Sequence, residues 1–112
     1  MTLGEYIEML EKYDPHTMLK KGLSKPDSWR GSYNECSFAV VENITVGEMI
    51  KSAKDFLKKG RMTGYKGGVF EVTEYTDINI DSYSEWSDGK AMWRFLIELM
   101  MSEGNAEHTL IL

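Results

Sequence analysis

The stretch that decides the fold class is Ser37-Phe38-Ala39-Val40-Val41-Glu42-Asn43-Ile44-Thr45-Val46-Gly47-Glu48. Residues 37–41 form an apolar run between polar residues, which is typical of a buried strand. Residues 45–48 form a capping box, in which the threonine hydroxyl and the glutamate carboxylate each accept a hydrogen bond from the other residue's backbone amide. The sequence therefore predicts a strand that leads directly into a helix, and this indicates a protein with both element types.

Two of the three predicted helices have clear start and stop signals. The first follows another capping box, Thr2-Leu3-Gly4-Glu5, and ends at Asp14-Pro15. The second follows Thr45 and ends at Gly60, a residue type that favours a helix C-cap. Apolar residues recur in both at intervals of three and four, so each helix is expected to bury one face.

The third predicted helix covers about residues 90–102, with Ser87 or Asp88 as its N-cap and Gly104-Asn105 at its end. Its apolar residues surround most of its circumference, which is more than one buried stripe requires. Either the helix runs through the centre of the core or its extra face meets another subunit. We expect the subunit contact, since the domain is small. The apolar residues are Met92, Trp93, Phe95, Leu96, Ile97, Leu99, Met100 and Met101.

Further strands are expected at residues 17–23, 69–73 and 76–81. The last two are separated only by Glu74-Tyr75, so they are predicted to form a hairpin. Together with 37–41, these segments predict an α+β fold, in which a small antiparallel sheet of about four to five strands packs with three helices. We expect residues 1–112 to form a single domain.

Composition excludes several classes of function. The formal net charge is −5, which opposes nonspecific binding to DNA, RNA or an anionic membrane. No apolar run approaches the ~20 residues of a membrane span, and no signal peptide is evident. The single cysteine, Cys36, excludes an internal disulfide and favours the cytoplasm. His16 and His108 suggest neither a nucleophile–histidine pair nor a metal site, so we expect no enzyme, no cofactor and no metal.

The first candidate binding loop is Lys25-Pro26-Asp27-Ser28-Trp29-Arg30-Gly31-Ser32-Tyr33. Pro26 fixes its own φ and is expected to hold Lys25 in an extended conformation. Gly31 lets the backbone approach a ligand closely. Trp29 and Tyr33 offer flat aromatic faces on either side of a guanidinium that can bind a phosphate with two hydrogen bonds. This loop therefore has the side chains of a binding surface.

The second candidate loop is Thr63-Gly64-Tyr65-Lys66-Gly67-Gly68. It is not a P-loop, because Lys66 is followed by Gly67 and the required spacing is absent. Its glycine amides could face a phosphate, with Lys66 as the counter-charge and Tyr65 as a stacking face. The alternative is a hairpin turn whose glycines supply positive φ angles. Cations also cluster near both loops, at Lys20, Lys21, Lys25 and Arg30, and at Lys58, Lys59, Arg61 and Lys66.

The segment Asp77-x-Asn79-x-Asp81 imitates the start of a calcium-binding loop. The match fails because Ser82 stands where glycine is needed and Asp88 stands where a bidentate glutamate is needed. Alternation of polar and apolar residues in a strand explains the segment better.

At its two loops the chain resembles a widespread family of small phage proteins. The shared motifs are Pro-x-Ser-aromatic-Arg-Gly-x-Tyr at residues 26–33, Thr-Val-Gly-Glu-Met at 45–49 and Thr-Gly-Tyr-Lys-Gly-Gly at 63–68. The resemblance covers roughly residues 1–81 and is specific in its combination of motifs. The family is similar to the anti-CBASS sponge proteins, which form tetramers and sequester cyclic dinucleotides such as cGAMP, so that bacterial immune effectors stay silent.

The resemblance implies a phage-encoded immune-evasion protein of the host cytoplasm that binds its ligand without cleaving it. The chain departs from the family pattern at Trp29, where tyrosine is more usual, and at Ser32, where an aromatic residue often stands. These departures leave the base preference open. The implied ligand-binding residues are Ser28, Trp29, Arg30, Gly31, Tyr33, Thr63, Tyr65, Lys66, Gly67 and Gly68.

Two alternative functions stay open at the level of sequence. A small phosphodiesterase acting on the same kind of signal would use the acidic residues Asp77, Asp81, Glu85 and Asp88. A protein-binding inhibitor of a host factor would instead use the exposed aromatics of the loops as hot spots.

Overall fold

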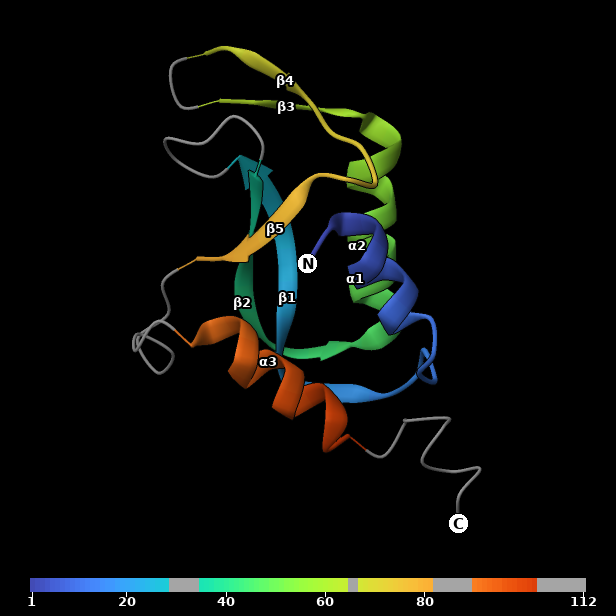
Figure 1. Cartoon of the computed structure of the whole chain (residues 1–112). Coiled ribbons are helices and arrows are strands. Elements are labelled where there is room, and N and C mark those ends of the chain that lie inside the picture. Colours follow the sequence, from blue (N-terminus) through green and yellow to red (C-terminus); the bar gives the residue numbers. More distant parts are fainter. Residues whose placement is uncertain (29–34, 65–66, 82–89, 103–112) are drawn as a thin grey trace.

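The computed structural model describes residues 1–28, 35–64, 67–81 and 90–102 (Figure 1). These residues form an α+β fold with three helices and five strands, so the predicted fold class is confirmed. The helices are α1 (Leu3–Leu10), α2 (Val46–Lys59) and α3 (Ala91–Met100). The strands are β1 (Met18–Ser28), β2 (Glu35–Thr45), β3 (Arg61–Thr63), β4 (Val69–Glu71) and β5 (Asp77–Ile80).

The strands form two sheets. The larger has the order β1-β2-β5, in which β1 and β2 are antiparallel and β5 runs parallel to β2. The smaller is an antiparallel ribbon of β3 and β4. Figure 1 shows α1 and α2 side by side along one side of the larger sheet, with α3 crossing its far end. The ribbon follows directly after the C-terminal end of α2. The position of α2 therefore determines where the ribbon lies.

The predicted all-antiparallel sheet is wrong, and so is the predicted hairpin of residues 69–73 with 76–81. The turn between these segments is fastened to the start of α1. The Gly4 amide donates to the Glu74 carbonyl and the Leu3 amide to the Thr76 carbonyl, both at 2.8 Å. The first amides of a helix have no partner within the helix, so they capture this turn. The chain is thereby led away from β4, and β5 pairs with β2 instead.

Both helix starts carry the predicted caps, although only the first capping box is complete. In α1 the Glu5 amide donates to Thr2 Oγ1 at 3.2 Å, and the Thr2 amide donates to Glu5 Oε1 at 2.9 Å. In α2 the Glu48 amide donates to Thr45 Oγ1 at 3.1 Å, but the carboxylate accepts from the Thr45 hydroxyl rather than from its amide. The C-cap of α2 is Gly60, with a φ of 70°, as predicted.

Aromatic residues from three elements meet in the core. The ring of Tyr6 on α1 lies 5.1 Å from that of Phe38 on β2 and 6.1 Å from that of Phe95 on α3. All three side chains are fully buried. Burial raises the pKa of the Tyr6 hydroxyl, which has no hydrogen-bond partner among the described residues. These contacts fix α1 and α3 to the sheet.

Helix α3 does not run through the centre of the core, so that alternative is wrong. It buries Phe95 and Leu99, whereas Trp93, Ile97 and Met100 are exposed. Its N-cap position is Lys90, whose side chain makes no capping hydrogen bond. The caps predicted at Ser87 or Asp88, and the stop at 104–105, lie outside the described residues. Within the described ranges, no helix is long and apolar enough to cross a membrane.

A tight contact between β1 and α2 generates a first prediction. A Cβ atom at Gly22 would lie 2.4 Å from Ile44 Cγ2 and 2.8 Å from Met49 Sδ. Gly22→Ala should therefore lower the free energy of unfolding by about 1–3 kcal/mol, as overpacking of a core does. Denaturant unfolding measures this. Lys20→Ala, at an exposed position of the same strand, is the control and should change the free energy by less than about 0.5 kcal/mol. An unchanged free energy of unfolding in Gly22→Ala would contradict the close approach of β1 to α2.

Candidate functional site

The structure brings together the flanks of the two predicted loops. Ser28 ends β1, and Thr63 ends β3. The hydroxyl of Ser28 donates a hydrogen bond of 3.0 Å to the backbone carbonyl of Thr63, across 35 positions of sequence. Figure 1 shows the end of β1 and the β3–β4 ribbon at the same end of the molecule, far from α3. The hydrogen bond therefore joins a residue of the first predicted loop to the first residue of the second.

Four of the ten predicted site residues lie in the described part of the chain: Ser28, Thr63, Gly67 and Gly68. The structure joins the first two directly. The other six lie outside the described residues, so their roles stay predictions: Trp29, Arg30, Gly31, Tyr33, Tyr65 and Lys66.

The glycines of the second loop have roles in the turn itself. The Gly64 amide donates to the Gly68 carbonyl at 2.6 Å, and the Gly67 amide donates to the Gly64 carbonyl at 2.9 Å. Gly67 has a φ of 87°, so the hairpin alternative is confirmed at this residue. A Cβ atom at Gly64 would lie 2.3 Å from the ring of Phe70. Two amides that we expected to face a phosphate are thus already engaged within the turn.

Lys25 has an unusual backbone conformation beside the first loop. Its φ is 52°, so the expectation that Pro26 holds it extended is wrong. The pairing of β1 with β2 shifts register between Ser24 and Asp27, which leaves Lys25 and Pro26 as a bulge. A lysine with positive φ costs free energy, and the cost is higher before proline. Bulges often redirect a side chain near a functional site.

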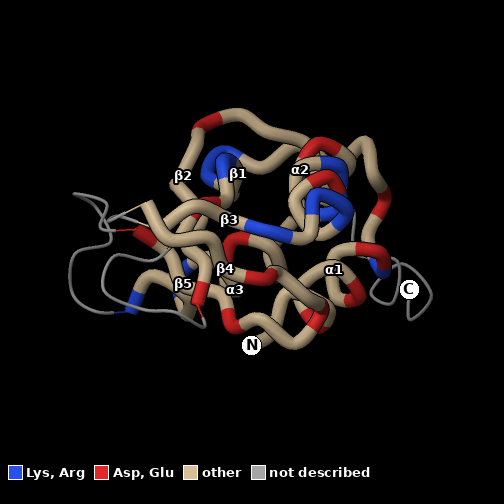
Figure 2. Tube along the Cα trace, turned by 90° about the horizontal axis from the view of Figure 1, so that it is seen from above, with Lys and Arg blue, Asp and Glu red and all other residues tan. Residues whose placement is uncertain are grey.

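Cations gather on the side of the molecule formed by β1, α2 and β3. Figure 2 shows blue segments on these three elements, while acidic residues predominate around α1, β4 and β5. Lys51 pairs with Asp55 at 2.7 Å, and Lys54 pairs with Glu11 at 3.4 Å. Across the described ranges, no ion pair engages the exposed cations nearest the two loops: Lys25, Lys58, Lys59 and Arg61.

Two acidic residues of the phosphodiesterase alternative, Asp77 and Asp81, lie in the described part of the chain. Asp77 starts β5 and forms a bridge with Thr2. Asp81 accepts a 2.5 Å hydrogen bond from the hydroxyl of Ser37, which is buried. Residues 77–80 form the predicted strand rather than a calcium loop. In the part of the chain that the structure describes, no group of three or more His, Cys, Asp or Glu residues could hold a metal ion. Glu85 and Asp88 lie outside that part.

Cys36 is fully buried on β2. Burial raises the pKa of its thiol to about 12, and the charge of Asp77 acts in the same direction. The thiol therefore stays protonated at neutral pH, as expected for a small core residue.

Sequence reasoning missed one open cleft of about 740 Å³. It lies between the segment from Asp14 to Lys20 and the last turn of α3, where Glu98, Met101 and Ser102 line it. No motif joins these two segments, so only the folded chain reveals the cleft. It is at the opposite end of the sheet from the Ser28–Thr63 hydrogen bond (Figure 1).

Comparison of the chain with protein-family models, with curated proteins and with solved structures finds no match.

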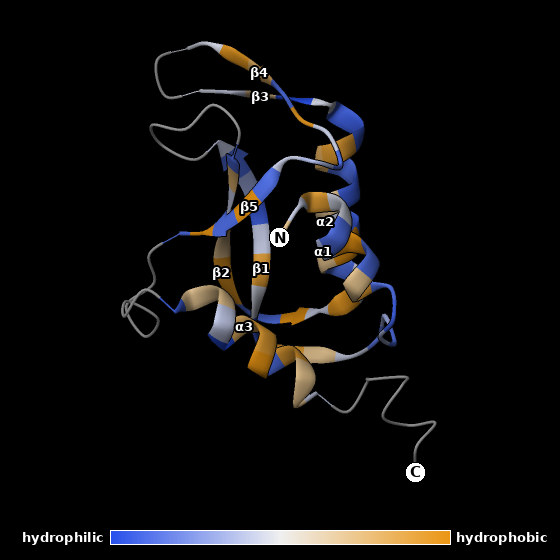
Figure 3. Ribbon diagram, in the orientation of Figure 1, coloured by the Kyte–Doolittle hydropathy of each residue, from blue (hydrophilic) through white to orange (hydrophobic). Residues whose placement is uncertain are grey.

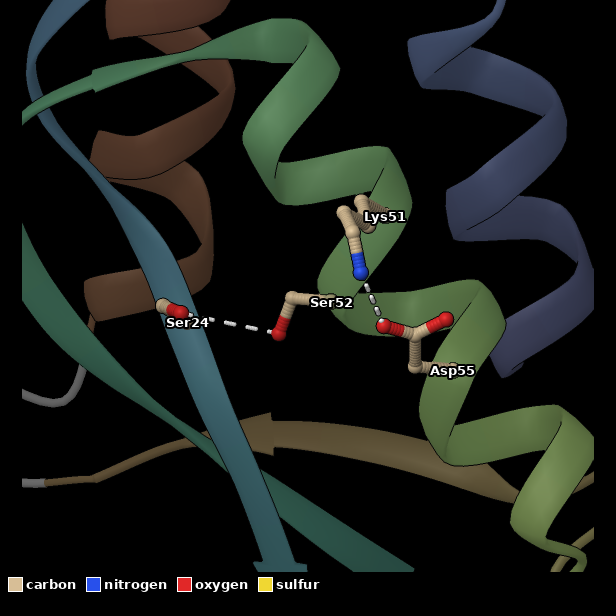
Figure 4. Close-up of polar contacts among 4 residues, drawn as sticks. All are labelled: Ser24, Lys51, Ser52 and Asp55. Carbon is tan, nitrogen blue, oxygen red and sulfur yellow. Dashed lines mark hydrogen bonds and ion pairs between the residues drawn. The ribbon is translucent and has the colours of Figure 1, made fainter.

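The hydrogen bond between Ser28 and Thr63 yields a second prediction. Ser28→Ala should release the ribbon from β1 and speed hydrogen exchange at the Gly64 and Gly67 amides, at a cost of about 0.5–1.5 kcal/mol. Exchange measured by NMR or mass spectrometry tests this. Ser24→Ala is the matched control, since its hydroxyl lies 3.5 Å from that of Ser52 on α2 (Figure 4). Equal exchange in both variants would show that the Ser28 bond does not hold the ribbon.

Proposed function

We propose that the protein is a phage immune-evasion factor of the host cytoplasm, which binds and sequesters a cyclic dinucleotide such as cGAMP without cleaving it. Such binding would silence CBASS-type antiviral signalling. The observation that carries the proposal is the hydrogen bond between Ser28 and Thr63, because it joins the two candidate loops directly. Two loops in contact can bind one ligand.

The side chains of the loops suit the chemistry of this ligand. A cyclic dinucleotide has two flat bases and two phosphodiesters. Trp29, Tyr33 and Tyr65 would stack on the bases, at about 1–3 kcal/mol for each stacked base. Arg30 and Lys66 would neutralise the phosphates. Two stacked bases and two charge-assisted contacts suffice for nanomolar affinity when the site is preformed.

Lys25 adds a further cation to the proposed site. It is exposed, lies three positions before Ser28 and takes part in no ion pair within the described residues. The bulge that carries it stores backbone strain. We attribute the strained backbone conformation of Lys25 to a role in contacting a phosphate.

The proposed protein is a homo-oligomer, as in the resembling family, where tetramers occur. The exposed apolar side of α3 supports self-association, since single helices rarely leave so many large apolar side chains in water. A two-fold assembly also suits a ligand built from two nucleotide units joined in a ring.

A thermal-shift screen against cyclic dinucleotides, cyclic trinucleotides and cyclic ADP-ribose isomers tests the function. Binding to the folded state raises the melting temperature. We expect a selective shift, and the same ligand recovered intact after denaturation. Cleavage of the ligand that requires a divalent metal and is lost in Asp81→Asn would favour the phosphodiesterase. No shift for folded protein would favour an inhibitor of a host protein.

Arg30 provides the third prediction. Arg30→Ala should weaken cyclic dinucleotide binding by about 2 kcal/mol, or about thirtyfold, through loss of a charge-assisted contact. Calorimetric titration measures the change. Lys54→Ala is the control, because its ammonium pairs with Glu11 on the helical side of the molecule. An Arg30→Ala protein that is folded and binds with unchanged affinity would remove this residue from the site.

The fourth prediction is that one substitution at Lys25 raises stability and weakens ligand binding. Lys25→Gly should raise the free energy of unfolding by about 1 kcal/mol, since glycine adopts a positive φ without strain. The same change should weaken ligand binding about fivefold, through loss of a contact worth ~1 kcal/mol. Asn43→Gly is a matched control, with a φ of 55° at the other end of the sheet. It should leave affinity unchanged. Equal affinity of both variants would exclude Lys25 from the site.

A further inference from the structure

Helix α3 presents a row of large apolar side chains to solvent, which we call the α3 stripe: Trp93, Ile97 and Met100. Their exposed fractions are 65%, 46% and 67%. The spacings of four and three residues place them on one side of the helix. Met101, at 80% exposure, flanks the stripe. Figure 3 shows apolar residues along the second half of α3, at the outer edge of the molecule.

The α3 stripe points away from the core of its own domain. Successive helical residues are turned by about 100°, so Phe95 and Leu99 lie on the side opposite Trp93 and Ile97. Phe95 and Leu99 are the two fully buried residues that α3 contributes to the core. The domain therefore cannot cover the stripe by tilting the helix, because that motion would expose Phe95.

A second copy of the chain fits the stripe better than an unrelated partner would. A stripe of this size exposes a few hundred Å² of apolar surface, which marks an interaction site, and a stable interface buries about 800 Å² on each partner. Around a two-fold axis the same surface serves both copies, so the apolar stripe of one meets the equally apolar stripe of the other. The stripe is smaller than about 800 Å², so the surfaces beside it must supply the rest of the buried area. Met18 at the start of β1 is 57% exposed and lies beside the C-terminal end of α3, so it extends the apolar area.

The ends of α3 favour an antiparallel partner. The helix has no side-chain N-cap, no acidic residue in its first turn and no basic residue in its last turn. Its dipole is therefore uncompensated within the helix. An antiparallel copy places the positive N-terminus of one helix beside the negative C-terminus of the other. It also sets the rigid ring of Trp93 against methionine, whose flexible thioether adapts to aromatic surfaces.

We propose that two copies of the protein pair through antiparallel α3 helices, with Ile97 at the two-fold axis and Trp93 of each copy packed on Met100 of the other. This arrangement rests on the self-association put forward with the function, and it adds the surface, the direction and the residues in contact. In a two-fold antiparallel pair, residues equally distant from the axis on either side face each other. Trp93 and Met100 lie four residues before and three residues after Ile97, so their levels differ by only one residue's rise, about 1.5 Å.

Cysteine crosslinking of the full chain tests this geometry without any nucleotide. The buried, high-pKa thiol of Cys36 will not react, so the unmodified protein is a clean background. Under mild oxidation, Ile97→Cys should form a covalent dimer. Trp93→Cys alone should not, because its two copies would lie at opposite ends of the interface. An equal mixture of Trp93→Cys and Met100→Cys chains should crosslink. Lys54→Cys, exposed on α2, is the control and should stay uncrosslinked.

Two outcomes would overturn the proposal. A covalent dimer of Trp93→Cys alone would mean parallel helices. Sedimentation of the unmodified protein at the mass of one 12.9 kDa chain, at crosslinking concentration, would mean that no second copy covers the stripe. Since the test contains no nucleotide, failed ligand binding and failed self-association are separate results.

Discussion

The close approach of β1 to α2 is the constraint on which the rest of the structure depends. Gly22 leaves room for Ile44 and Met49, and the neighbouring Leu23 amide donates to the Met49 sulfur at 3.3 Å. This contact gives the amide of an edge strand a partner and sets α2 alongside the strand. Because β3 follows α2 directly, the position of the helix decides where the ribbon begins. The Ser28–Thr63 hydrogen bond is a consequence of that placement.

The two ends of the sheet have different chemistry. At one end, β3 and the Lys25 bulge carry cations that take part in no ion pair among the described residues, on an otherwise acidic protein. At the other end, α3 carries apolar surface. The proposed function uses the first end for an anionic ligand and the second for a further copy of the chain. The separation lets assembly occur without covering the ligand site.

Local signals in the sequence predicted local structure well. Capping chemistry at Thr2 and Thr45 located two helix starts, and Gly60 located a helix end. The buried strand at 37–41 is confirmed within a longer strand, β2. Strand pairing was not predictable in the same way, because hydrogen bonds from Leu3 and Gly4 to a distant turn decide it. The conformation of Lys25 likewise depends on the register between β1 and β2, which its own sequence does not reveal.

In the two loops as well, the sequence indicated local features, whereas contacts between distant segments required the structure. Composition predicted that residues 25–33 and 63–68 are binding segments, and the fold adds a hydrogen bond between Ser28 of the first and Thr63 of the second. The turn role of Gly67 was one of two alternatives in the sequence, and its φ of 87° confirms that role. The cleft between β1 and α3 had no signal in the sequence, since its two walls are far apart in the chain.

The most direct test of the central claim, that both loops bind one ligand, is NMR mapping of the backbone amides during titration with a cyclic dinucleotide. The account predicts that amides of residues 25–33 and 61–68 shift together along a single binding curve. Shifts confined to one loop, or centred on the cleft at residues 14–20, would contradict it.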